Sequence, residues 1–172
     1  MRSAFVLLFS AILAVGTIAC SRTRSASYQD AVQNALEQAD LKDVKVDENV
    51  DKNTITLGGT LHSEDAKQKA AQVAQSAAGE RVIANQISVE PVGVESDARA
   101  MESNVDDAIE KNYKAALIAN GLAKQNIRYA AKNGVLTLKG SVKVRQQREK
   151  AQQIATSVPN VEQVVNQIQI NR

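Results

Sequence analysis

Two stretches of the chain, 81 positions apart, have the same pattern: residues 55–61 read ITLGGTL and residues 136–142 read LTLKGSV. Extending this match in both directions aligns residues 28–89 with residues 109–170 without a gap. A gap-free match of this length in a protein of 172 residues indicates an internal duplication. We therefore expect the protein to fold as two copies of one small unit.

The spacing of apolar residues predicts the same elements in each unit, in the order helix, strand, strand, helix, strand. Val32 and Leu36 recur at helical spacing, whereas Ile55 and Leu57 alternate as the residues of a strand do. Residues 132–134 read Lys-Asn-Gly, which is typical of a tight hairpin between two strands. The sequence thus predicts an α+β fold of two repeated sandwiches, each with its helices on one face of a small sheet.

Serine residues predict where several helices begin, because a serine hydroxyl can cap a helix. Ser27 with Asp30, and Ser103 with Asp106, are the predicted starts of the first helix in each unit. Ser63 is the predicted cap of the second helix in the first unit. The predicted segments are a signal peptide at 1–19, a tether at 20–27, an acidic unit at 28–90, a linker at 91–104 and a basic unit at 105–172.

The N-terminal segment has the form of a signal peptide. A basic start at Arg2 precedes an apolar stretch at residues 4–15, which is too short to span a bilayer, since a span needs about 20 residues. The single cysteine, Cys20, ends a Thr-Ile-Ala-Cys sequence that resembles the lipobox of bacterial lipoproteins. This resemblance implies lipidation of Cys20, and Ser21 after it favours sorting to the outer membrane. An ordinary signal peptide with an incidental cysteine is the alternative.

The repeated unit resembles the BON family, named for bacterial osmotically inducible and nodulation proteins. The resemblance rests on a Leu-x-Gly motif at 57–59 followed by Asn-Gln-Ile at 85–87, and on the same pair at 138–140 and 166–168. The turn at 159–161 reads Pro-Asn-Val, close to the Pro-Gly-Val turn usual in the family. The resemblance implies two BON-like sandwiches in an exported protein. Some such proteins are outer-membrane lipoproteins that bind anionic phospholipid or support envelope integrity.

The net charge of +2 conceals an uneven distribution of charge. Residues 28–90 carry a net charge of −5, residues 91–108 carry −4, and residues 109–172 carry +8. In one interpretation the acidic unit docks on the basic unit, or both faces are simply solvated. In the other, the basic unit faces an anionic surface. An exported protein without a pair of stacking aromatic residues is not expected to bind nucleic acid.

The second unit is predicted to carry the membrane-binding surface. It is apolar at two positions where the first copy is polar: Ile118 aligns with Glu37, and Val144 aligns with Ser63. Basic residues beside exposed aliphatic side chains favour an anionic membrane surface. The predicted site comprises Ile118, Lys139, Lys143, Val144, Arg145, Arg148 and Lys150.

No constellation of residues predicts catalysis, a cofactor or a metal site. The run Asp47-x-Asn49-x-Asp51 matches the start of a calcium loop, but Lys52 stands where that loop requires glycine. His62 is expected to be a surface residue, because no nucleophile pattern surrounds it. The sequence therefore favours a binding protein over an enzyme.

We expect a non-enzymatic envelope lipoprotein, tethered through Cys20 to the periplasmic face of the outer membrane. Its expected partners are anionic phospholipid and, as a second class, envelope proteins. The alternative is a soluble periplasmic osmotic-stress protein that binds client proteins as a chaperone does. Asn85 and Asn166 are predicted to be buried amides that satisfy backbone groups rather than ligands.

Overall fold

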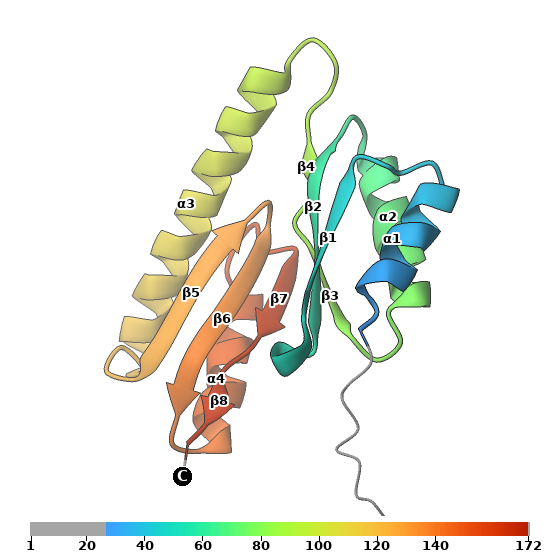
Figure 1. Cartoon of the computed structure of the whole chain (residues 1–172). Helices are drawn as coiled ribbons and strands as arrows, with labels where there is room; N and C mark the ends of the chain where they lie inside the picture. The colour runs from blue at the N-terminus through green and yellow to red at the C-terminus, as the bar shows by residue number, and fades with distance from the viewer. Residues whose placement is uncertain (1–26, 172) are drawn as a thin grey trace, which may run out of the picture.

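The computed structural model describes residues 27–171, which form two α+β units (Figure 1). The first unit comprises helix α1 (Gln29–Gln38), strand β1 (Val44–Asn49), a 3-10 turn (Val50–Lys52), strand β2 (Thr54–Leu61), helix α2 (Glu64–Ala77) and strands β3 (Val82–Asn85) and β4 (Ser88–Val89). The second comprises helix α3 (Glu95–Ala119), strands β5 (Asn126–Lys132) and β6 (Val135–Val142), helix α4 (Arg145–Thr156) and strands β7 (Gln163–Asn166) and β8 (Gln169–Ile170). The predicted order of elements is confirmed, with the last strand of each unit split in two. The predicted signal peptide and the lipidation at Cys20 lie outside the described residues.

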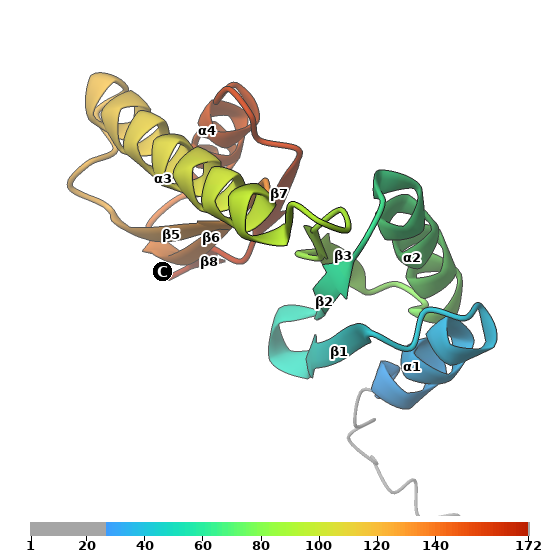
Figure 2. The same cartoon turned by 90° about the horizontal axis from the view of Figure 1, so that it is seen from above.

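In each unit one central strand pairs with all the others. Strand β2 is antiparallel to β1 and parallel to β3 and β4, and β6 pairs in the same way with β5, β7 and β8. Both helices of a unit cover one face of its sheet, as Figures 1 and 2 show from two directions. The predicted hairpin is also confirmed, since Lys132 pairs with Val135 across a turn in which Asn133 and Gly134 have positive φ. The α+β sandwich fold predicted from the sequence is therefore confirmed.

Each unit has its own apolar core between its helices and its sheet. Leu36, Ile55 and Leu57 are fully buried in the first unit. The second unit also buries an aromatic ring, Tyr113, whose hydroxyl donates a hydrogen bond to the carbonyl oxygen of Ala151 at 3.2 Å. Burial raises the pKa of the Tyr113 phenol, so this group stays neutral. The two cores are therefore separate and differ in their largest residue.

A glycine of the central strand lies at the same place in both units. Gly59 has φ 104° and Gly140 has φ 106°, a backbone conformation that favours glycine. A Cβ atom at Gly59 would collide with the backbone oxygen of Asp43, and one at Gly140 would collide with that of Asn126. The repeated glycine is thus required by the close approach of two strands.

Helix α3 begins earlier than the sequence predicted. It covers Glu95–Ala119, 25 residues or about 37 Å, so Ser103 lies inside it and the cap predicted there is wrong. The acidic residues Glu95 and Asp97 lie in its first turn, where the helix dipole favours negative charge. Of the predicted linker, only residues 91–94 lie outside this helix. Most of the predicted linker is therefore the first part of a helix that continues into the second unit.

Of the other predicted caps, Ser63 is confirmed and Ser27 is wrong. The Oγ atom of Ser63 accepts a hydrogen bond from a backbone nitrogen of α2 at 3.2 Å. Ser27 instead donates to the carboxylate of Glu48, a residue of β1, at 2.7 Å. That carboxylate accepts a hydrogen bond from the backbone nitrogen of Tyr28 at 2.9 Å, so a strand residue caps α1.

Glu48 is held in its charged form by these contacts. Its side chain is 2% exposed and lies 2.9 Å from Nε of Arg81. Burial acts to raise the pKa of Glu48, but hydrogen bonds from Ser27, Tyr28 and Arg81 outweigh it and leave that pKa below its usual range. The start of α1 is therefore fixed by a buried, charged and fully hydrogen-bonded carboxylate.

The two units contact each other along β3 and β7. The side chain of Gln163 accepts a hydrogen bond from the backbone nitrogen of Asn85 at 3.1 Å and donates one to the carbonyl oxygen of Ile83. A small buried apolar cluster lies beside these bonds: Ala84, Val135 and Val165. Helix α3 also contacts the end of the first unit, where the carboxylate of Glu102 accepts a hydrogen bond from the backbone nitrogen of Val89. The units are therefore joined by hydrogen bonds to the backbone and by little apolar surface.

Two ion pairs between the units have opposite arrangements of charge. In one, Nζ of Lys67 lies 3.4 Å from Oε2 of Glu162. The signs of this ion pair are reversed, because the lysine belongs to the acidic unit and the glutamate to the basic unit. A second ion pair has the other arrangement, because the guanidinium of Arg99 in α3 lies 2.6 Å from the carboxylate of Glu90 at the end of the first unit. The two ion pairs therefore neither support nor contradict the interpretation in which charge docks the acidic unit on the basic unit.

Candidate functional site

The predicted residues Lys143, Val144 and Arg145 form the junction between β6 and α4. All three are exposed, and Val144 keeps 45% of its surface accessible. Ile118, in the last turn of α3, is 59% exposed. Figure 1 shows that α3 ends and α4 begins at the same end of the second unit. The structure therefore brings these four predicted residues to one end of the unit.

A hollow of about 500 Å³ lies at this end of the unit. It is lined by Lys124, Gln125, Asn126, Ser141, Val142, Lys143 and Asn171. The prediction missed Lys124, which lies in the loop after α3, because no periodic pattern places a loop residue. We call the set Ile118, Lys124, Lys143, Val144 and Arg145 the basic end.

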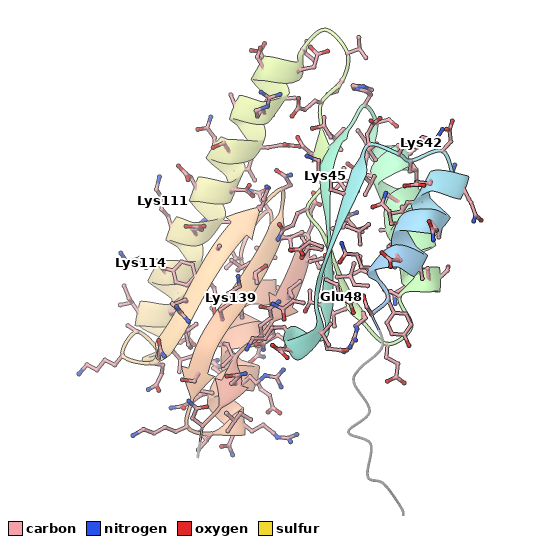
Figure 3. All side chains as sticks on the ribbon, viewed as in Figure 1. Lys42, Lys45, Glu48, Lys111, Lys114 and Lys139 are labelled. Atoms are coloured by element: carbon pink, nitrogen blue, oxygen red, sulfur yellow. The ribbon has the colours of Figure 1, made fainter. Side chains whose placement is uncertain are left out.

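The remaining three predicted residues lie elsewhere on the second unit. Lys139 is exposed on β6 opposite Arg128 of β5, on the face of the sheet that the helices do not cover (Figure 3). Lys150 is exposed on α4, so the sheet separates it from Lys139. Arg148 is half-buried, and its carbonyl oxygen accepts a hydrogen bond from Nδ2 of Asn166 at 3.4 Å. The predicted site is therefore divided, and only part of it forms one patch.

Arg128 is a basic surface residue that the prediction missed. The hairpin at residues 132–134 sets the pairing of β5 with β6, so counting back from the turn places Arg128 opposite Lys139. Figure 3 also shows Lys111 and Lys114 along α3, which adds positive charge to the same unit. The turn signal could have found Arg128 from the sequence, because hairpin register follows from turn type.

The start of α4 lacks the features that stabilise the start of α2. Val144 has the extended backbone of a cap residue, but its side chain makes no capping hydrogen bond. The first turn of α4 contains Arg145 and no acidic residue, whereas α2 has Glu64 and Asp65 there. Positive charge at a helix start opposes the helix dipole. Basic side chains beside the backbone N–H groups of a helix start suit an anion such as a phosphate group.

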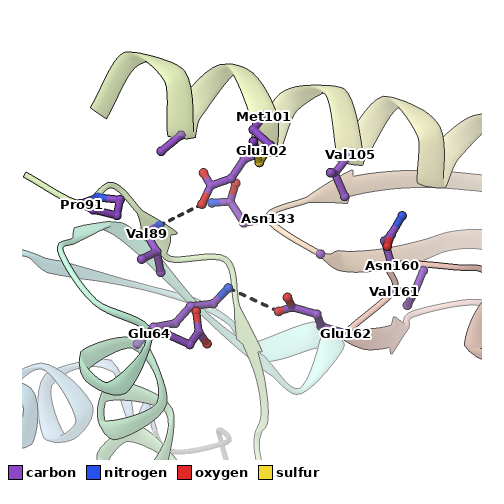
Figure 4. Close-up of a pocket in the computed structure, with 13 residues that line it drawn as sticks. Glu64, Val89, Pro91, Met101, Glu102, Val105, Asn133, Asn160, Val161 and Glu162 are labelled. Carbon is purple, nitrogen blue, oxygen red and sulfur yellow. Dashed lines mark hydrogen bonds and ion pairs between the residues drawn. The ribbon is translucent and has the colours of Figure 1, made fainter. Parts of the chain in front are cut away.

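A second hollow, of about 480 Å³, lies between the two units beside the first half of α3 (Figure 4). Its apolar lining residues are Val89, Pro91, Ala98, Met101, Val105 and Val161. Glu64, Glu102 and Glu162 also line it, while the lining cation Lys67 is paired with Glu162. Glu102 is fixed by a hydrogen bond from the backbone nitrogen of Val89 at 2.9 Å. We call this hollow the inter-unit pocket.

Asn85 and Asn166 have the structural role predicted for them. Nδ2 of Asn85 donates a hydrogen bond to the carbonyl oxygen of Lys67 at 3.2 Å, and Asn166 makes the equivalent bond to Arg148. Both are half-buried rather than fully buried. Each therefore ties the last strand of its unit to the second helix of that unit.

Metal and membrane-spanning features are absent from the part of the protein that the structure describes. Within residues 27–171, no three His, Cys, Asp or Glu side chains are grouped as a metal ion would require. No helix in that range is both long enough and apolar enough to cross a membrane. His62 is exposed, as predicted, with Nδ1 2.8 Å from the carbonyl oxygen of Glu90.

A family model described as "BON domain" matches residues 25–91 and residues 105–172. A search of curated protein sequences finds no match. Among solved structures the protein is similar to the C-terminal domain of CdsD, a structural protein of the type III secretion system of Chlamydia trachomatis. That likeness has 15% identity and a TM-score of 0.32, and covers 83% of this chain and 67% of that one. A second CdsD structure from this organism also gives 15% identity and a TM-score of 0.32, over 84% of this chain and 61% of that one.

Proposed function

Because the chain belongs to the BON-domain family, we propose that it is a non-enzymatic lipoprotein of the cell envelope whose second unit binds anionic phospholipid. BON domains are generally non-catalytic and are associated with envelope and periplasmic proteins, with phospholipid binding and with stress responses. The family therefore supports the class of function, and the basic end supports its location on this protein.

The observation that carries the proposal is the start of α4. At the equivalent place in the first unit, Ser63 caps α2 and Glu64 follows it; here Val144 and Arg145 take their places. Both replacements disfavour the helix, because the cap is lost and the charge opposes the helix dipole. A phosphate headgroup would satisfy the helix start and the basic side chains together, while Val144 and Ile118 would contact the acyl region.

The position of α1 is consistent with a protein whose basic end faces the membrane. Figure 1 shows that α1 begins in the lower half of the molecule, the half in which α4 also begins. Only the short segment 20–28 would separate a lipid on Cys20 from α1, and nine residues span at most about 30 Å. A lipid anchor and the basic end would therefore face the same membrane.

A vesicle-binding experiment tests the lipid proposal. The protein from Ser21 to Arg172 should bind vesicles of phosphatidylglycerol and not vesicles of phosphatidylcholine. The double variant Lys143→Glu/Arg145→Glu should bind phosphatidylglycerol at least about 30-fold more weakly, since each basic residue near an anionic surface contributes about 1 kcal/mol. Binding should also weaken as salt is added, because the attraction is electrostatic.

A matched control makes the same change of net charge on the first unit. Lys42 and Lys45 are exposed there, so Lys42→Glu/Lys45→Glu should leave vesicle binding close to that of the parent. Equal binding of the parent to both lipids, or equal loss in both double variants, would contradict a lipid site at the basic end.

Membrane fractionation tests the anchor separately. The wild-type protein should fractionate with membranes and incorporate labelled palmitate, and Cys20→Ala should do neither. A soluble, unlabelled wild-type protein would favour the alternative function, a periplasmic stress protein that binds client proteins.

A further inference from the structure

We infer that copies of this protein bind one another. The basic end of one copy docks in the inter-unit pocket of the next copy. The basic end is the surface that the proposed function assigns to lipid. Lipid and a second copy would therefore compete for it, and the protein would assemble where anionic lipid is absent.

The receiving surface is apolar in its wall and acidic around it. Met101 is 68% exposed and lies among the aliphatic side chains of the inter-unit pocket. Three carboxylates and one cation, Lys67, line the pocket, and the whole segment 28–108 carries a net charge of −9. Such a surface fits a partner that presents aliphatic side chains flanked by cations.

The basic end has that chemistry. Ile118 and Val144 are 59% and 45% exposed, and Lys143 and Arg145 flank Val144 in the sequence. Residues 109–172 carry a net charge of +8. The molecule itself therefore carries a surface complementary to its own pocket in both polarity and charge.

The basic end of one copy cannot reach the inter-unit pocket of the same copy. Met101 and Ile118 both lie on α3, and a separation of 17 positions places them about 25 Å apart along the helix. The basic end takes no part in the contact between the units, whereas Lys67 and Glu162, which line the pocket, are paired with each other there. Docking between copies therefore joins two different surfaces, and it builds open filaments, closed rings or a dimer in which each copy fills the pocket of the other.

Two single substitutions in the protein from Ser21 to Arg172 test the inference. Met101→Arg adds a cation to the pocket wall at an exposed helix position, so the fold should be kept. Sedimentation should show that the parent associates at low salt and that Met101→Arg associates at least tenfold more weakly. Val92→Arg adds the same charge at a residue that is 79% exposed and outside the pocket, so it should associate as the parent does.

Mixing the variants tests the pairing of two different surfaces. Met101→Arg lacks a working pocket, and Lys143→Glu/Arg145→Glu lacks a working basic end, so neither should associate alone. Mixed together they should form one-to-one dimers, because each supplies the surface that the other lacks. Failure of the mixture to form dimers, or association of either variant alone, would overturn the inference.

A single methyl group reports whether the pocket is occupied. Met101 is the only methionine of the sequence after Met1, so methyl-labelled Lys143→Glu/Arg145→Glu gives one methionine signal. Adding unlabelled Met101→Arg should shift that signal, and an unchanged signal would exclude the pocket as the receptor.

Vesicle binding keeps the two proposals distinguishable. Met101→Arg should bind phosphatidylglycerol as the parent does, because its basic end is intact. If the parent binds no lipid but still forms the mixed dimers, the proposed function fails and the inference stands. Phosphatidylglycerol vesicles should dissociate the assemblies of the parent protein, and phosphatidylcholine vesicles should not. Assemblies that persist on anionic vesicles would refute competition between lipid and a second copy for the basic end.

Discussion

Gly59 and Gly140 occupy the one position in each unit where the backbone excludes any side chain. Both have φ near 105°, and both lie against a backbone oxygen at the start of the neighbouring strand, that of Asp43 or of Asn126. Gly58, which precedes Gly59, is different. Its φ is not positive, and a Cβ atom there would have no other atom within 4 Å. Two adjacent glycines of β2 are therefore under opposite constraints.

This contrast gives a matched pair of substitutions. Gly59→Ala and Gly140→Ala should each lower the free energy of unfolding by about 2 kcal/mol or more, through backbone strain and the collision with a carbonyl oxygen. Gly58→Ala should change it by less than about 0.5 kcal/mol, because the methyl group enters open space. Urea denaturation of the three variants measures these values, and equal losses at Gly58 and Gly59 would contradict the assignment.

Glu48 shows why some single-residue roles escape sequence analysis. The capping pattern pointed to Ser27, which is adjacent to α1, but the oxygen that caps the helix comes from a strand about 20 positions later. The serine is used to bind that carboxylate instead. A cap from a distant residue depends on how β1 packs beside α1, and no local pattern records it.

At the scale of elements, α2 and α4 have the same place in the fold and opposite starts. The serine cap and acidic first turn of α2 follow the rules for a stable helix, and the valine and arginine of α4 break them. The backbone of Val144 is nevertheless extended, as a cap residue requires. A hydroxyl oxygen at this position would therefore find its partner.

Val144→Ser should stabilise the protein by about 1 kcal/mol by capping α4. The same change should weaken binding to phosphatidylglycerol vesicles, because an exposed aliphatic side chain is lost. Val144→Ala is the control, since it also removes aliphatic surface but cannot cap. Thermal unfolding and vesicle binding of the two variants check this, and a serine variant no more stable than the alanine variant would show that α4 needs no cap.

Helix α3 is longer than a capping signal at Ser103 predicts, because no helix breaker lies directly before that serine. Neither glycine nor proline occurs between Gly93 and Gly121, and the acidic residues Glu95 and Asp97 favour a helix start. The correct start was therefore present in the sequence. The sequence does not show that the first half of α3 forms one wall of the inter-unit pocket, because the other walls come from other elements.

At the scale of the whole molecule, Gln163 joins the two units. Its amide group bonds both a backbone nitrogen and a backbone carbonyl oxygen of β3, as a neighbouring strand would. Other contacts join the units as well: Nε2 of Gln167 donates to Oγ1 of Thr54, Nδ2 of Asn133 donates to the carbonyl oxygen of Gln86, and Lys67 pairs with Glu162. Gln163 differs from these residues because it binds two backbone groups of one strand, β3.

Gln163→Ala should lower the free energy of unfolding by about 1–3 kcal/mol, because it leaves two backbone groups of β3 without their partner. Hydrogen exchange of the Asn85 amide should accelerate, while exchange at Leu57 in the core of β2 should change little. Gln169→Ala, at an exposed position of β8, is the matched control and should affect neither quantity. Protection of Asn85 that survives the loss of Gln163 would contradict this role.

The sequence by itself determined the duplication, the order of elements, the two cores, the tight hairpin and the cap at Ser63. These features arise from residues that are close in the sequence or related by a fixed offset, so periodicity and turn chemistry reveal them. It also predicted that the aliphatic side chains of Ile118 and Val144 are exposed.

The tertiary structure alone decided which of those residues lie together, where Glu48 and Gln163 bind, and how the inter-unit pocket forms. It separated Lys139 from Lys150 by the thickness of a sheet and brought Lys124 to the basic end. The physical reason is that such contacts join residues 20 to 95 positions apart, and their geometry is set by the packing of whole elements. No pattern within a single helix or strand records that packing.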